Sequence, residues 1–164
     1  MILYIVRHAW AADPGDPAWP DDRQRPLTAE GRQRFVAVAK RLAQRGLAPE
    51  LIATSPLVRC HQTAEILAKE LGRKRKIVPL EALAPGSDLG QLVHWTNHDA
   101  AKCGEVAWVG HAPDVDRLTA ALIGDGRASI QFSKGAVAAV EFDGPVQPAT
   151  GQLRWLVTAK LLGC

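Results

Sequence analysis

MILYIVRHAW, residues 1–10, combines a short apolar, β-rich run with a basic pair, Arg7 and His8. Residues 2–7 are too few to span a membrane and lack the basic leading region of a signal peptide, so they predict a buried first strand. In open α/β sheets, ligands bind beyond the carboxyl ends of the strands. The stretch therefore predicts a strand and places His8 where a ligand would bind.

A second stretch, AWVGHA at residues 107–112, ends in the same way, with His111 after an apolar strand. Two parallel strands that both end in histidine bring their imidazoles to one edge of the sheet. We therefore expect His8 and His111 to face each other across a small site.

Strand and helix patterns alternate along the chain, which predicts a single α/β domain over residues 1–164 with a mostly parallel sheet. Thr28 is the predicted N-cap of the first helix, and Ser55-Pro56 the predicted start of the second. A Pro/Gly turn region separates the last two strands, which we expect to pair antiparallel. The predicted strands are residues 2–7, 50–54, 76–80, 105–110, 137–142 and 152–158, and the predicted helices are residues 29–44, 56–71, 87–97 and 113–123.

The composition is that of a soluble globular protein, since 47% of the 164 residues are hydrophobic, 23% are charged and the net charge is +3. No apolar run is long enough to predict a membrane span. The three cysteines, Cys60, Cys103 and Cys164, form no CxxC pair, so we expect a cytoplasmic protein without disulfides. The basic run RKRK at residues 73–76 is either a solvated helix end or a partner or nucleic-acid patch. We expect neither a nucleic-acid nor a membrane partner.

Residues 10–27 differ from the rest of the chain, because they hold four prolines and four aspartates. A connection of this length between a strand and a helix is unusual, and such loops are often functional. We therefore predict a loop here whose role the sequence leaves open.

Two arginines are expected to join the histidines. Arg7 directly precedes His8, and Arg59 lies in the first turn of the helix predicted at residues 56–71, which begins at the same sheet edge. Guanidinium groups match phosphate oxygens, and helix N-termini attract anions. The four side chains together predict a site for a dianionic phosphate.

Other enzyme classes lack their motifs in this chain. His94 and His98 have the i, i+4 spacing of zinc ligands, yet no third ligand follows at a suitable spacing. No arginine follows a cysteine at the spacing of a cysteine-based phosphatase, and no GxxxxGK[ST] loop occurs. We therefore expect no metal site and no P-loop nucleotide hydrolysis.

Four segments resemble, in order and spacing, the motifs of the histidine phosphatase superfamily, also called phosphoglycerate mutase-like. They are Arg7-His8-Ala9, residues 25–31 (RPLTAEG), residues 55–64 (SPLVRCHQTA) and Val109-Gly110-His111. Ala9 stands where glycine is commoner in the family. The short chain, Ala9 and the terminal LRWLV strand are most similar to the SixA type, the phosphohistidine phosphatases.

The resemblance implies a three-layer α/β/α sandwich whose six-stranded sheet is mostly parallel with one antiparallel strand. It also implies that His8 is the nucleophile and carries the phosphoryl group, while Arg7, Arg59 and His111 bind the phosphate oxygens. It implies no metal ion and no cofactor.

Two carboxylates are candidates for the general acid that protonates the leaving group. Glu81 follows the third predicted strand and resembles the position of the acid in mutases and many phosphatases of the superfamily. Asp114 begins the helix after His111, where a carboxylate also suits the helix dipole. A departing imidazole needs less protonation help than an alkoxide does.

Several substrates are compatible with this pattern. The connection between the third and fourth strands is only about 25 residues, where mutases of the superfamily carry longer covering insertions, so we expect an open site. An open site favours a phosphohistidine protein over a small sugar or glycerate phosphate. The alternatives are a small-molecule phosphomonoesterase, a mutase-like phosphotransferase and a phosphate-binding module without catalysis.

Overall fold

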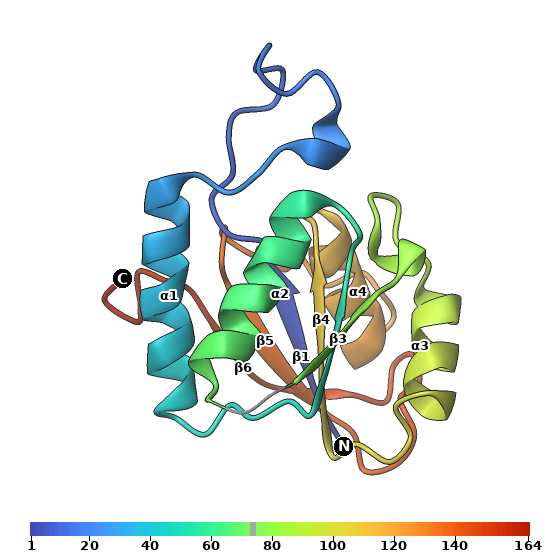
Figure 1. The fold of residues 1–164 in the computed structure, drawn as a ribbon. Coiled ribbons are helices and arrows are strands. Elements are labelled where there is room, and N and C mark those ends of the chain that lie inside the picture. The colour runs from blue at the N-terminus through green and yellow to red at the C-terminus, as the bar shows by residue number, and fades with distance from the viewer. Residues whose placement is uncertain (73–74) are drawn as a thin grey trace.

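The computed structural model describes residues 1–72 and 75–164, which form a three-layer α/β/α sandwich (Figure 1). Within these residues the sheet has six strands in the order β3-β2-β4-β1-β5-β6. Strand β5 runs antiparallel to both of its neighbours, and all other pairings are parallel. This confirms the predicted sheet with its one antiparallel strand. The strands are β1 (Ile2–Arg7), β2 (Leu51–Thr54), β3 (Lys76–Pro79), β4 (Glu105–Gly110), β5 (Val137–Glu141) and β6 (Gln152–Val157).

Helices cover both faces of the sheet (Figure 1). Alternate residues of β1 feed the two resulting cores, because successive side chains of a strand point to opposite faces. Tyr4 and Val6 join the core beneath α1 and α2, whereas Leu3 and Ile5 join the core beneath α3 and α4. The helices are α1 (Ala29–Ala43), α2 (Val58–Glu70), α3 (Leu89–His98) and α4 (Asp114–Ile123), with 3-10 turns η1 (Asp22–Gln24) and η2 (Glu81–Leu83).

One predicted helix start is confirmed and the other is wrong. Thr28 is the N-cap of α1, and its Oγ1 accepts a hydrogen bond of 2.9 Å from the Gly31 N–H. Helix α2 begins two residues later than predicted, because its N-cap is Leu57 and Ser55 and Pro56 lie outside it. The Ser55 hydroxyl accepts a hydrogen bond of 3.3 Å from the Leu57 N–H and also contacts the ring of His111.

Residues 10–27 project from the carboxyl edge of the sheet as a loop (Figure 1). A bridge between Ala11 and Leu27 closes its base, and η1 lies on its returning arm. Most of the projecting residues are exposed, Trp19 among them. The predicted loop is thus confirmed, with both of its ends held at the edge that carries the histidines.

Two further predictions concern the basic run at residues 73–76 and the absence of a membrane span. Arg73 and Lys74 lie outside the described residues, so both interpretations of the basic run stay predictions. Among the described residues, no helix has the length and apolar character that crossing a bilayer requires.

Candidate active site

Neighbouring strands bring the two histidines together. Strands β1 and β4 pair in parallel with Arg7 opposite Gly110, so the residues that follow, His8 and His111, leave the sheet side by side. Their ring centroids are 5.3 Å apart, and the ring planes meet at 63°. The two imidazoles therefore face each other as the sequence predicts.

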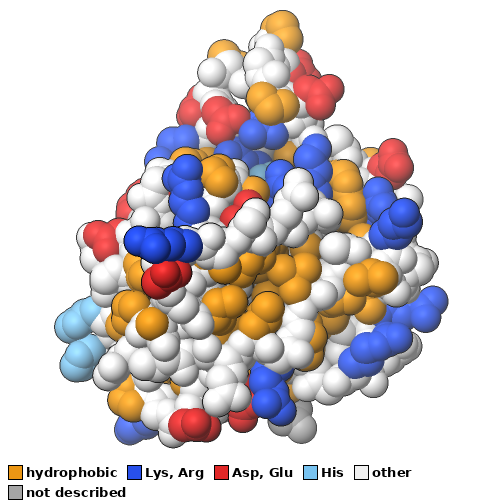
Figure 2. Space-filling model, turned by 180° about the vertical axis from the view of Figure 1, so that it is seen from behind, with side chains coloured by type: hydrophobic (Ala, Val, Ile, Leu, Met, Phe, Trp, Pro, Cys, Tyr) orange, Lys and Arg blue, Asp and Glu red, His pale blue; other side chains and the backbone are white. Residues whose placement is uncertain are grey.

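The histidines lie in a cavity of about 470 Å³ at the base of the projecting loop. Lys and Arg side chains gather around a hollow below this loop (Figure 2). The lining includes the predicted quartet, which is Arg7, His8, Arg59 and His111. The structure therefore brings these four side chains together. The cavity is lined by Arg7, His8, Ala11, Pro14, Arg25, Arg59, Pro85, Gly86, His111, Ala112, Pro113, Asp114, Arg117 and Lys134.

His8 is a buried imidazole with one ring nitrogen held by the backbone. Its Nδ1 lies 2.7 Å from the carbonyl oxygen of Ala9, which can only accept, so Nδ1 carries the proton and Nε2 keeps its lone pair. Burial, together with the nearby His111, Arg59 and Arg7, lowers the pKa of His8 to about 3, against the opposing effect of the Ala9 carbonyl. The imidazole is therefore uncharged at neutral pH, with Nε2 available for attack.

His111 is also buried and neutral. Burial and the neighbouring Arg59 lower its pKa to about 4. Its Nε2 lies 2.9 Å from the Ser55 hydroxyl and 3.4 Å from the Cys60 sulfur. These two contacts fix the orientation of the ring beside His8.

Arg7 and Arg59 are each hydrogen-bonded to acceptors of the protein, and the buried Nε of each has no acceptor within the described part of the chain. Arg7 donates from Nη1 to the Phe132 carbonyl at 2.6 Å. Arg59 donates from Nη1 and Nη2 to the backbone oxygen and carboxylate of Asp22, at 2.8 and 3.0 Å. The buried Nε atoms of both arginines have no acceptor among the described residues. The guanidinium groups of both arginines nevertheless line the cavity, and guanidinium groups match the oxygens of a phosphate in charge and geometry.

Sequence reasoning missed three further cations of the cavity. Arg25 is buried, and it donates from Nε to the Asp22 carboxylate at 2.8 Å and from Nη1 to the Ala12 carbonyl at 2.7 Å. Arg25 begins the RPLT motif, and this could have marked it as a site residue. We used the motif only to place the start of the first helix. Arg117 and Lys134 lie exposed at the rim, and nothing local in the sequence marks them.

The structure brings only one of the two candidate acids to the cavity. Asp114 lines it, is 8% exposed, and accepts a hydrogen bond of 2.9 Å from the Gly86 N–H. Glu81 is exposed, pairs with Arg23 at 2.8 Å and lines a different hollow beside α3. Glu81 therefore lies apart from the histidines, although its role as an acid stays untested.

Metal and thiol chemistry find little support in the described residues. The rings of His94 and His98 stack on α3 with centroids 4.3 Å apart, and no described cluster of three His, Cys, Asp or Glu side chains could hold a metal ion. Burial raises the pKa of the Cys60 thiol to about 12, so Cys60 stays protonated beside His111.

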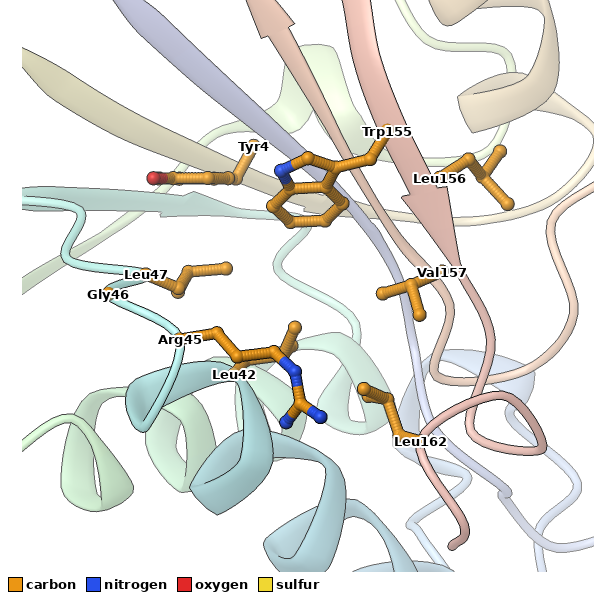
Figure 3. A pocket seen from close by; sticks show the side chains of 9 residues that line it. All are labelled: Tyr4, Leu42, Arg45, Gly46, Leu47, Trp155, Leu156, Val157 and Leu162. Atoms are coloured by element: carbon orange, nitrogen blue, oxygen red, sulfur yellow. The ribbon is translucent and has the colours of Figure 1, made fainter.

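A second cavity, of about 320 Å³, lies between β6 and the C-terminal end of α1 (Figure 3). The rings of Tyr4 and Trp155 stand on one side of it with centroids 6.0 Å apart, and Arg45 is the charged residue of its lining. Its lining contains no histidine among the described residues. This largely apolar cavity therefore lacks the groups that phosphoryl transfer requires.

Residues 3–114, which contain the complete quartet, match the histidine phosphatase superfamily (branch 1). The chain belongs to this superfamily. It is 30% identical over 159 residues to the phosphohistidine phosphatase SixA of Escherichia coli, which covers 94% of this chain and 92% of SixA. It is also 44% identical over 124 residues to an uncharacterised protein of Picosynechococcus, covering 74% of this chain and 73% of that protein.

Solved structures of histidine phosphatases have the same fold. The protein histidine phosphatase SixA complexed with tungstate matches this chain with a TM-score of 0.86 and 26% identity, over 99% of each chain. The alpha-ribazole phosphatase of Shigella flexneri matches with a TM-score of 0.68 and 18% identity, over 97% of each chain, and so shares the fold. The family and the fold together identify the chain as a phosphatase.

Proposed function

We propose that this histidine phosphatase hydrolyses phosphohistidine on proteins through a phosphoryl intermediate on His8. The arrangement of His8 is the observation that carries the proposal. A neutral imidazole presents Nε2 to a cavity in which Arg7 and Arg59 each keep a buried Nε without an acceptor. A phosphoryl group bound there would lie beside His8 and between the guanidinium groups of Arg7 and Arg59 that line the cavity.

In the first step, His8 Nε2 attacks phosphorus and forms a P–N bond. The P–N bond to the substrate imidazole breaks in line, and its electron pair stays on the departing nitrogen, which takes up a proton. Arg7, Arg59 and His111 stabilise the negative charge that spreads over the phosphoryl oxygens. In the second step, water attacks phosphorus and passes one proton to the Asp114 carboxylate. The bond to Nε2 breaks with its electron pair returning to Nε2, and hydrogen phosphate and neutral His8 result.

Asp114 is the better placed proton donor for the leaving group. It lines the same cavity as the histidines, whereas Glu81 is paired with Arg23 outside it. An imidazole leaving group makes only a modest demand on such an acid, whereas an alkoxide makes a large one. Asp114 therefore matters most if the substrate is a phosphate ester.

Two observations favour a protein substrate. The 25-residue connection between β3 and β4 holds only η2 and α3 as regular structure, so no long insertion covers the site. The similarity to SixA, a protein histidine phosphatase, extends over nearly the whole chain. A large substrate could therefore bring a phosphohistidine to the cavity.

A small-molecule phosphomonoesterase is the second candidate. The carboxylate of Asp114 inside the cavity favours it, because an alkoxide leaving group requires such an acid. Retention of the phosphoenzyme, as in a mutase, requires that water be excluded, which an open cavity opposes. A binding module without catalysis would need none of the features that keep His8 neutral.

The test is a comparison of kcat/KM on three substrates with a chelator present: a phosphohistidine protein, an aryl phosphate and a glycerate phosphate. We expect the phosphohistidine protein to be hydrolysed fastest and the chelator to have no effect. A preference for glycerate phosphate, together with loss of that activity in Asp114→Asn, would replace the proposal by the second candidate. Mass spectrometry of the acid-quenched protein should locate a labile phosphoryl group on His8.

A further inference from the structure

The cations of the catalytic cavity fall into two sets. Arg7, Arg25 and Arg59 are anchored to acceptors of the protein. Arg117 on α4 and Lys134 before β5 are exposed at the rim, and their side chains make no hydrogen bond or ion pair with any described residue. The inner set is held ready for the phosphoryl group, whereas the rim set has no partner within the part of the chain that the structure describes.

Charge balance separates the two sets further. The carboxylates of Asp22 and Asp116 offset two of the three inner arginines, because Asp22 pairs with Arg25 and Arg59 and Asp116 is close enough to Arg7 to oppose the lowering of its pKa by burial. A phosphoryl group with about two negative charges more than balances the third. Both histidines are neutral at pH 7, because their pKa values are lowered to about 3 and about 4. Asp114, the proposed proton donor, is the acidic side chain among the cavity's described lining residues. The inner arginines are therefore balanced without the rim cations, and Arg117 and Lys134 stay without an acceptor among the described residues.

The rim also has room for more of the substrate than the phosphoryl group. A second hollow of about 210 Å³ adjoins the cavity and shares Asp114 and Arg117 with it. Leu118 of α4 also lines this hollow, and Ser87 and Leu89 line it from the start of α3. A chain segment next to the phosphorylated residue could lie in this hollow, alongside Arg117.

We propose that Arg117 and Lys134 form a second anion site, which binds a carboxylate of the substrate protein close to its phosphohistidine. The inference rests on the proposed function and names its substrate class: phosphohistidine in an acidic sequence context. Exposed charges at the rim attract an oppositely charged substrate, so they affect substrate binding more than the rate of the chemical step.

Two phosphohistidine peptides test this, identical except that Glu or Gln flanks the phosphorylated residue. We expect the unmodified enzyme to prefer the Glu peptide about three- to thirtyfold in kcat/KM, mainly through KM, since each exposed charge pair contributes modestly. Raising the salt concentration to about 1 M should shrink the preference, because the charges are exposed.

The variant Arg117→Gln/Lys134→Gln should lose the preference. Its matched control is Lys102→Gln/Lys160→Gln, which removes the same charge from exposed lysines outside the cavity lining and should keep it. The reversed variant Arg117→Glu/Lys134→Glu should prefer a peptide flanked by Lys.

Equal losses on both peptides in Arg117→Gln/Lys134→Gln would overturn the second anion site, as would loss of the preference in the control. Failure of the proposed function looks different. In that case the unmodified enzyme hydrolyses neither peptide but still hydrolyses an aryl phosphate, and both proposals are overturned.

Discussion

His8 holds its proton on Nδ1 through the Ala9 carbonyl, so Nε2 is the nitrogen that would act as the proposed nucleophile. We expect His8→Ala to lower kcat/KM by at least about a thousandfold, because no other group can form the phosphoryl intermediate. Steady-state kinetics measure this, with His98→Ala, an exposed histidine on α3, as the control. Activity near that of the unmodified enzyme in His8→Ala would mean that the phosphoryl group passes directly to water.

Asp22 contacts two arginines of the cavity from the projecting loop. Its carboxylate accepts from Arg59 Nη2 at 3.0 Å and from Arg25 Nε at 2.8 Å. Asp22→Asn removes the charge and one acceptor, so Arg59 is held less firmly, and we expect kcat/KM to fall about tenfold. The control is Asp21→Asn, since Asp21 contacts the Arg23 N–H instead. Equal effects of the two variants would show that the loop, and not the arginine contact, is responsible.

At the residue scale, the quartet could be predicted because each member follows a recognisable element end. Arg25 was missed although it begins the RPLT motif, because its position at the cavity depends on a contact with Asp22 that the loop creates. Glu81 was expected near the site because it follows a parallel strand. Strand β3 lies at the edge of the sheet, however, with β2 and β4 between it and β1. Glu81 pairs instead with Arg23 of the projecting loop.

Helix α1 packs against the start of the projecting loop through Gly31. A Cβ built on Gly31 would overlap the carbonyl oxygen of Trp10, a backbone atom that also accepts a hydrogen bond from the Thr28 N–H. We expect Gly31→Ala to lower the free energy of unfolding by about 1–3 kcal/mol, the usual range for overpacking. Urea denaturation measures it. The control is Gly144→Ala, where a Cβ meets open space, and a similar loss in both variants would refute the overlap.

At the element scale, helices with a clear apolar stripe were predicted almost to their ends. Residues 113–123 were expected, and α4 spans Asp114–Ile123. The start of α2 was missed because Ser55 has the residue type of a cap, yet its hydroxyl is directed to His111. Local propensity cannot indicate such a contact, since the strand that supplies it lies over fifty residues away. The strand order likewise depends on pairing between distant segments.

At the scale of the whole molecule, the buried histidines link stability to pH. The pKa of His8 is lowered to about 3 in the folded protein, against about 6.5 when unfolded. Between these values the unfolded chain binds a proton that the folded protein does not, so stability is full above pH 6.5 and declines as the pH falls. His111, lowered to about 4, acts in the same direction.

We expect each of these histidines to lower the free energy of unfolding by up to about 2 kcal/mol between pH 6.5 and pH 5. Urea denaturation at several pH values measures the slope. His8→Gln should make the slope shallower, whereas His98→Gln should leave it unchanged because His98 is exposed. An unaltered slope in His8→Gln would show that His8 binds its proton equally in both states.

The central place of β1 has a consequence for the persistence of the site. The Arg7 amide donates to the Ala136 carbonyl, and the His8 amide donates to the Gly110 carbonyl, both at 3.0 Å. The backbone at Arg7 and His8 is therefore hydrogen-bonded to both neighbouring segments. Amide protons in such a position exchange with deuterated water mainly when the whole domain opens, whereas those of an exposed loop exchange early. We therefore expect the amides of Arg7 and His8 to exchange late, and the exposed amides of the projecting loop to exchange early.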